Sequence, residues 1–117
     1  MIRRGEIHDA RLDPTEGSEQ AGARPVIIVS RNAINDNSTL LLAVPCSTYR
    51  GRRLYPSQVL LQAPDGGLDV DSVAMAEQVR VLSQTLLSRR RGLLSAATLA
   101  QIDRALLITF DLPGQSP

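Results

Sequence analysis

The chain has 117 residues, of which 43% are hydrophobic and 21% are charged, and its formal net charge is +1. This length fits one domain, and the composition is that of a globular protein rather than a disordered or membrane-spanning one. No apolar run approaches the ~20 residues of a membrane span, and the first ten residues lack the apolar core of a signal peptide, so we expect a cytoplasmic protein with no membrane partner.

All 13 basic residues are arginine, whose planar fork can hold phosphate through paired hydrogen bonds. Genomic base composition is the simpler cause of the missing lysines, so the positions of the arginines are more informative than their number. Two clusters, at 50–53 and at 89–91, are either solvated surface or an electrostatic footprint for nucleic acid. With only 3% aromatic residues, the chain lacks stacking platforms, so RNA would be held through phosphates and base edges.

In chain order, the first half predicts strands separated by polar loops. Residues 5–12 form a plausible strand, although Asp9 and Ala10 weaken it. The segment DPTEGSEQAGARP at 13–25 is longer and more polar than a connector needs. Stronger strands are predicted at 25–30, at 39–44, where Pro45 closes the strand, and at 57–61. Residues 31–38 indicate a turn or short helix, and CSTYRGRRLY at 46–55 a polar loop.

The second half begins with turn residues at 63–68. Alternating residues at 72–76 and 78–82 predict one long bent strand or two. Residues 83–88 indicate a short helical turn, and 91–94 a short strand at best.

Ser95 can cap a final helix, which Pro113 would end. Its apolar stripe consists of Leu99, Ile102, Leu106 and Phe110. Many short strands followed by one amphipathic helix predict a mainly β fold, a small antiparallel barrel or curled sheet with the helix packed on it. We expect a single domain over residues 1–112 and a short flexible tail at 113–117.

The sequence contains few of the residue types that bind metals or cofactors. His8 and Cys46 are too few for a zinc site, and Asp65, Asp69 and Asp71 do not match a calcium-binding loop. No glycine-rich nucleotide loop is present. Cys46 follows a β-rich run, where a small buried side chain is the default, although a Cys–His nucleophile pair is formally possible. We therefore expect no metal and no cofactor.

Hydroxyl, carboxylate, amide and guanidinium groups remain, and they form three sets at or near strand ends. The sets are Ser18, Glu19 and Gln20 with Arg24; Ser47 and Thr48; and Glu77, Gln78 and Arg80. The third set lies inside a predicted strand, where a Glu-Gln pair is out of place unless it points to a site.

These residues carry a family resemblance. The segments RRGEI, DPTEGSEQAGARPVIIVS, VPCST and GGLDVDSVAMAEQVRVL resemble, in this order, the motifs of the MazF/PemK family of toxin endoribonucleases. The resemblance implies a compact SH3-like barrel, a homodimer, and metal-independent, sequence-selective cleavage of single-stranded mRNA that inhibits translation and growth. It also implies a cognate antitoxin that occludes the RNA site. In the family pattern, the catalytic residues correspond to Arg24 and Thr48.

The chemistry suits these groups. RNA can be cleaved without metal by the neighbouring 2′-hydroxyl, and Arg24 would then stabilise charge on the phosphoryl oxygens. Thr48 would hydrogen-bond the phosphoryl group or orient the hydroxyl. Because arginine is a poor base at neutral pH, Glu19 or solvent is the easier proton acceptor. The other candidate substrate contacts are Ser18, Gln20, Ser47, Arg50, Glu77, Gln78 and Arg80.

Simpler interpretations stay open. Arg24 could pair with Glu19 or Asp13 and pin the loop, Thr48 could be a turn residue, and Glu77 and Gln78 could satisfy loop amides. Two other functions are a CcdB-like gyrase poison and a non-catalytic RNA-binding barrel. The first resembles the same barrel but depends on a C-terminal tryptophan motif, and this chain has no tryptophan.

Overall fold

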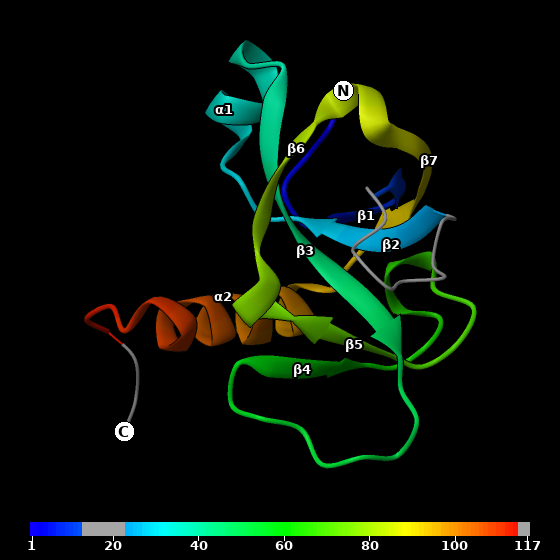
Figure 1. Cartoon of the computed structure of the whole chain (residues 1–117), viewed down its shortest axis with the longest axis vertical. Coiled ribbons are helices and arrows are strands. Elements are labelled where there is room, and N and C mark those ends of the chain that lie inside the picture. The colour runs from blue at the N-terminus through cyan, green and yellow to red at the C-terminus, as the bar shows by residue number, and fades with distance from the viewer. Residues whose placement is uncertain (13–22, 115–117) are drawn as a thin grey trace.

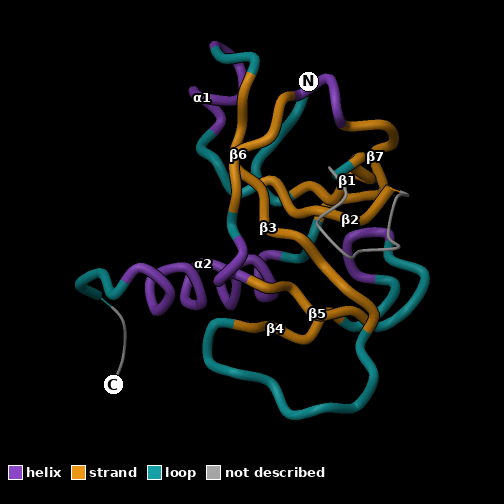
Figure 2. Tube along the Cα trace, in the orientation of Figure 1, coloured by secondary structure: helices purple, strands orange, loops and turns teal. Residues whose placement is uncertain are grey.

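The computed structural model describes residues 1–12 and 23–114 (Figures 1 and 2). Its strands are β1 (Glu6–Arg11), β2 (Ala23–Ile28), β3 (Leu40–Thr48), β4 (Gln58–Leu61), β5 (Ser72–Met75), β6 (Arg80–Ser83) and β7 (Leu87–Leu93). Its helices are α1 (Asn32–Asn37) and α2 (Ala96–Phe110). Three single 3₁₀ turns lie between the later strands: η1 (Asp65–Gly67), η2 (Ala76–Gln78) and η3 (Gln84–Leu86).

The seven strands form one antiparallel sheet in the order β4-β5-β3-β2-β1-β7, with β6 also paired to β3. Figure 1 shows this sheet curling on itself, with β6 and β7 turning back over β1–β3. The prediction of a mainly β fold with a C-terminal helix is confirmed. Over the described residues β4, β6 and β7 each pair with one strand only and so are edges, which means that the sheet is curled rather than closed into a full barrel.

Strand β3 is longer than predicted, because Pro45 does not end it. The strand continues to Thr48 and changes partner along its length. Its first half pairs with β6 up to Ala43, and its second half pairs with β5 from Cys46 onward. Pro45 lies at this changeover, where a missing backbone N–H is tolerated in a sheet. The continuation carries Ser47 and Thr48 out to the end of a long ordered strand.

Two hydrophobic clusters fill the two faces of the curled sheet. In β2, Ile27 packs in one cluster, while Val26 and Ile28 pack in the other. Both faces of β2 are therefore buried, which explains its unbroken apolar run. The first cluster also contains Ile102 and Ala105 of α2, so the helix closes that face.

Helix α2 begins as predicted. The Ser95 side chain accepts a hydrogen bond from the Thr98 amide, and both Ser95 and Thr98 also donate to the Asp65 carboxylate. The helix ends at Phe110, followed by Asp111 in a left-handed conformation (φ 55°). Phe110, the last residue of the predicted apolar stripe, is 56% exposed.

Two other expectations about the second half differ from the structure. Glu77 and Gln78 lie in the 3₁₀ turn between β5 and β6 rather than inside a strand. Strand β7 extends over 87–93 rather than 91–94, because it pairs along β1 with two register shifts. Its arginines form ion pairs with carboxylates of β1, and local sequence cannot reveal these pairings. The helical turn predicted within 83–88 is present as η3.

Candidate active site

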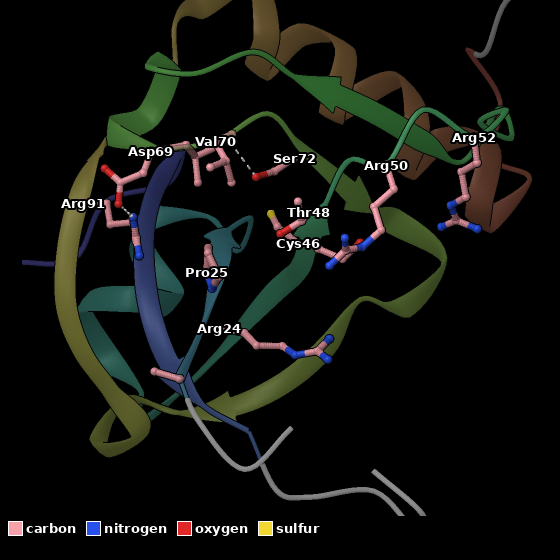
Figure 3. A pocket seen from close by; sticks show the side chains of 13 residues that line it. Arg24, Pro25, Cys46, Thr48, Arg50, Arg52, Asp69, Val70, Ser72 and Arg91 are labelled. Carbon is pink, nitrogen blue, oxygen red and sulfur yellow. Dashed lines mark hydrogen bonds and ion pairs between the residues drawn. The ribbon is translucent and has the colours of Figure 1, made fainter. Parts of the chain in front are cut away.

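A pocket of about 630 Å³ opens where β2 begins and β3 ends (Figure 3). Its lining includes Arg24 from β2, Ser47 and Thr48 from β3, and Arg50 and Arg52 from the loop that follows. The opposite wall is formed by the 68–70 loop, Ser72 of β5 and Arg91 of β7. Separate parts of the chain thus converge on one cavity.

The sheet register explains why Arg24 and Ser47 converge. Strands β2 and β3 are antiparallel, with Val26 opposite Pro45. Arg24 lies two residues before Val26, and Ser47 lies two residues after Pro45, so both approach the same end of the strand pair. On the other side of β3, Thr48 pairs with Ser72 of β5. The sheet thereby places the predicted guanidinium and hydroxyl groups in one pocket.

The pocket is rich in positive charge. Among the described residues, Arg24, Arg50, Arg52 and Arg91 line it, and Asp69 is the single lining carboxylate. Within residues 1–12 and 23–114, the only one of these four arginines that forms an ion pair is Arg91. A cavity with several guanidinium groups that form no ion pair with a described carboxylate attracts a polyanion.

The hydroxyl groups differ in accessibility, and the thiol is shielded. Thr48 is exposed and Ser47 is half-buried. Cys46 is only 1% exposed, and burial raises the pKa of its thiol to about 12. A buried thiol that stays protonated is a poor nucleophile. Cys46 therefore acts as a small core residue, as its position after an apolar run indicated.

The other predicted site residues lie elsewhere. Ser18, Glu19 and Gln20, and also Asp13, fall outside the described residues. Glu77, Gln78 and Arg80 do not line the pocket. The Glu77 carboxylate accepts hydrogen bonds from Ser57 Oγ (3.0 Å) and Gln58 Nε2 (2.9 Å), and Gln78 Nε2 lies 3.5 Å from Met75 Sδ. Arg80 pairs with Ala43 in the sheet.

Four charged or hydroxyl-bearing pocket residues were not predicted as site residues: Arg52, Asp69, Ser72 and Arg91. Arg91 was recognised only as part of a basic cluster, and Asp69 only as one of three aspartates that do not match a calcium-binding loop. They meet across 22 positions of sequence, with Arg91 Nη1 3.1 Å from Asp69 Oδ2. No local sequence pattern indicates such a pair. The one related sequence feature is the glycines at 66, 67 and 92, which allow the backbones of η1 and β7 to approach closely.

The described residues contain neither a group of side chains arranged to hold a metal ion nor a helix that could cross a membrane. In residues 1–12 and 23–114, no group of three or more His, Cys, Asp and Glu side chains is arranged to hold a metal ion. The same part of the chain has no helix both long and apolar enough to cross a membrane.

Comparison with known proteins identifies the family. The sequence profile of the PemK-like, MazF-like toxins of type II toxin–antitoxin systems matches residues 3–110. The chain belongs to this family. Endoribonuclease MazF9 of Mycobacterium tuberculosis is 44% identical over 116 residues, which is 96% of this chain and 98% of the relative.

Solved structures of MazF-type proteins have the same fold. An endoribonuclease from a mycobacterial species, in complex with its cognate antitoxin, matches with a TM-score of 0.80 and 28% identity over 97% of this chain and 98% of that one. MazF from Deinococcus radiodurans matches with a TM-score of 0.77 and 26% identity over 95% of this chain and 97% of that one. The curled sheet with its C-terminal helix is therefore the fold of this toxin family.

Proposed function

We propose that this protein is the toxin of a type II toxin–antitoxin system and an endoribonuclease that cleaves single-stranded mRNA without metal. The observation that carries the proposal is the arginine-rich pocket in which Arg24 and Thr48 converge. The match to the toxin family and the 44% identity to a protein named as an endoribonuclease support it. They favour it over a gyrase poison and over a non-catalytic RNA-binding barrel.

The proposed reaction is attack of a ribose 2′-oxygen on the adjacent phosphorus, which expels the 5′-oxygen of the next nucleotide. The products are a 2′,3′-cyclic phosphate end and a 5′-hydroxyl end. The phosphoryl oxygens gain negative charge in the transition state, and a fixed guanidinium stabilises that charge. Arg24 has this role in the proposal, because it lies in the pocket and carries no ion pair with another described residue.

Thr48 is the proposed hydrogen-bond donor to the phosphoryl group. Its exposure at the end of β3 leaves the hydroxyl accessible to substrate. Ser47 and Arg50 are the proposed neighbouring substrate contacts, since both line the same pocket. Glu19 is the proposed proton acceptor, with Ser18 and Gln20 beside it as substrate contacts.

Glu77, Gln78 and Arg80 would contact RNA only outside this pocket, on a second part of the surface. Their positions at η2 and β6 suit an RNA that extends beyond the cavity. The family match also supports a cognate antitoxin that occludes the pocket, a homodimer, and action in the cytoplasm, where mRNA is translated.

Cleavage of a long RNA in EDTA tests the proposal. The wild-type protein should give defined fragments, and a 2′-deoxy substitution at a mapped cut site should prevent cleavage there. Arg24→Ala should lower kcat/KM by about 10²-fold or more, which is typical of losing a charge-stabilising donor. Thr48→Val, which keeps the shape, should lower it by about tenfold or more.

Arg104→Ala is the matched control, since it removes an exposed arginine of α2 that does not line the pocket. Wild-type rates for Arg24→Ala would rule out its role. Intact RNA together with trapped gyrase–DNA complexes would instead favour the gyrase poison, and RNA binding without cleavage would favour the non-catalytic barrel.

A further inference from the structure

Arg91 is held in the pocket by two carboxylates of different character. Its Nε donates to Asp9 Oδ1 at 2.6 Å, and the Asp9 side chain is only 14% exposed. Its Nη1 donates to Asp69 Oδ2 at 3.1 Å, and the Asp69 side chain is 82% exposed. The Asp9 contact anchors the guanidinium in the wall, whereas the Asp69 contact lies at the solvent side. Figure 3 shows the Asp69–Arg91 pair across the pocket from Arg50 and Arg52.

Close packing of the backbone fixes Asp69 opposite Arg91. A Cβ atom at Gly67 would lie 2.1 Å from the Arg91 carbonyl oxygen, and one at Gly92 would lie 2.9 Å from the Gly66 backbone. Gly67 also has a φ of 78°, which side chains disfavour. The end of η1 therefore rests directly on β7, and this contact positions Asp69, two residues after Gly67, beside Arg91.

We propose that Asp69 occupies an RNA phosphate subsite on Arg91 and is displaced when RNA binds. This inference rests on the proposed ribonuclease function. Arg91 keeps its Nε hydrogen bond to Asp9 throughout, so the guanidinium does not have to move. Departure of Asp69 leaves Nη1 and Nη2 as a fork, and such a fork matches two phosphate oxygens.

The exposure of Asp69 to solvent makes it feasible for an RNA phosphate to replace this carboxylate on Arg91. An ion pair with a carboxylate this exposed contributes little net stability, because water competes for both groups. A phosphate offers more acceptor oxygens and arrives with neighbouring phosphates that bind Arg24, Arg50 and Arg52 in the same cavity. In the free protein, Asp69 occupies Nη1 of Arg91 and adds a negative charge to the pocket, and so weakens the affinity of the pocket for RNA.

Binding of a non-cleavable probe tests this directly. The probe is a fluorescent single-stranded 2′-O-methyl RNA of randomised sequence, which lacks the nucleophile for cleavage, and anisotropy gives its Kd. Asp69→Asn keeps the size of the side chain and removes its charge. It should tighten binding about two- to fivefold, the range expected for an exposed ion pair. The slope of log K against log salt should steepen by about 0.7, as for one more phosphate contact.

A double-mutant cycle with Arg91→Lys separates the subsite from a general charge effect. Lysine retains a positive charge near Asp9 but has no fork, so Asp69→Asn should tighten binding less in the Arg91→Lys protein than in the wild-type protein. Asp36→Asn removes a carboxylate that pairs with Arg3, away from the pocket, and should leave the Kd unchanged. Equal tightening by Asp69→Asn in the wild-type and Arg91→Lys proteins, or equal tightening by Asp36→Asn, would overturn the subsite.

The test of the Asp69 subsite can fail or succeed independently of the test of the ribonuclease function. Tighter probe binding by Asp69→Asn, together with no cleavage of natural RNA by the wild-type protein, would refute catalysis and support the subsite. Normal cleavage with an unchanged Kd for Asp69→Asn would support catalysis and refute the subsite. Binding of an Asp/Glu-rich peptide, measured in parallel, tests whether the pocket binds a different ligand. If Asp69→Asn tightens binding of the peptide but not of the RNA probe, the RNA subsite is refuted.

Discussion

Glu6, at the start of β1, is a carboxylate that folding removes almost completely from water, since the residue is only 5% exposed. Burial alone would raise its pKa, but hydrogen bonds from His8, the Arg3 amide and Arg90, with the charge of Arg90, outweigh it. They lower the pKa from 4.5 to about 2. The unfolded chain therefore takes up a proton on Glu6 at a higher pH than the folded protein does. The stabilisation is complete above about pH 4.5 and is lost as the pH falls toward 2.

Glu6→Gln tests this dependence. At pH 7 the variant should be less stable than wild type by about 2–3 kcal/mol, because it loses the ionised acceptor for His8 and Arg90. The difference should shrink at about pH 3, where wild type has itself lost part of the contribution. Urea unfolding at pH 7 and pH 3 measures this difference in stability. Asp69→Asn is the control for net charge, since the Asp69 side chain is 82% exposed and its ion pair contributes little net stability. A difference independent of pH would show that shape or packing, not ionisation, is responsible.

The candidate site illustrates what single residues reveal in a sequence. Arg24, Ser47, Thr48 and Arg50 were predicted from polar groups at strand ends and from the family resemblance, and all four line the pocket. Asp69 and Arg91 were not predicted as a site pair, because their contact depends on packing between a loop and a strand distant in sequence. Glu77 and Gln78 looked anomalous in a predicted strand, and the anomaly disappears in a 3₁₀ turn.

At the scale of elements, the approach of the η1 loop to β7 depends on glycine. A Cβ atom at Gly67 would collide with the Arg91 carbonyl, which is backbone and cannot rotate away. Gly67→Ala should therefore destabilise the protein by about 3 kcal/mol or more, combining strain at positive φ with overpacking. Gly51 provides a matched control, because its φ is 83° but no atom lies within 4 Å of the added Cβ.

Gly51→Ala should cost only about 1–2 kcal/mol, the strain of the left-handed conformation alone. Urea denaturation midpoints of the two variants give the comparison. Similar losses for both would mean that the loop moves freely off β7, and the fixed position of Asp69 would then no longer hold.

The elements that could be predicted are those whose stability is encoded locally. The buried run of β2 and the Ser95 cap of α2 both carry their own signals, and both are present. The elements that were misjudged depend on partners. Strand β3 passes through Pro45 because it exchanges β6 for β5 there, and β7 is long because β1 supplies both backbone and carboxylate partners. Neither partner is visible in a local window of sequence.

At the scale of the whole molecule, an apolar patch remains on the outer face of the β3–β6 pair. Leu40 and Leu42 point outward from β3 and are 48% and 42% exposed, and Val81, which pairs with Leu42, is 54% exposed. Three neighbouring aliphatic side chains on a sheet face are costly to leave in water. A domain of this size gains stability by covering such a surface, so we expect the patch to form the interface of the proposed homodimer.

Leu42→Glu and Val81→Glu should each convert the dimer to a monomer, because dimerisation would then bury an unpaired charge at its centre. Light scattering after size exclusion gives the mass, and circular dichroism checks that the monomer stays folded. Leu93→Glu is the control, since Leu93 is a 56% exposed aliphatic residue on β7, away from the patch. A dimer that survives both patch substitutions would place the interface elsewhere, and a monomeric wild type would refute the homodimer itself. If the patch substitutions also weaken cleavage of long RNA, the second subunit contributes to substrate binding.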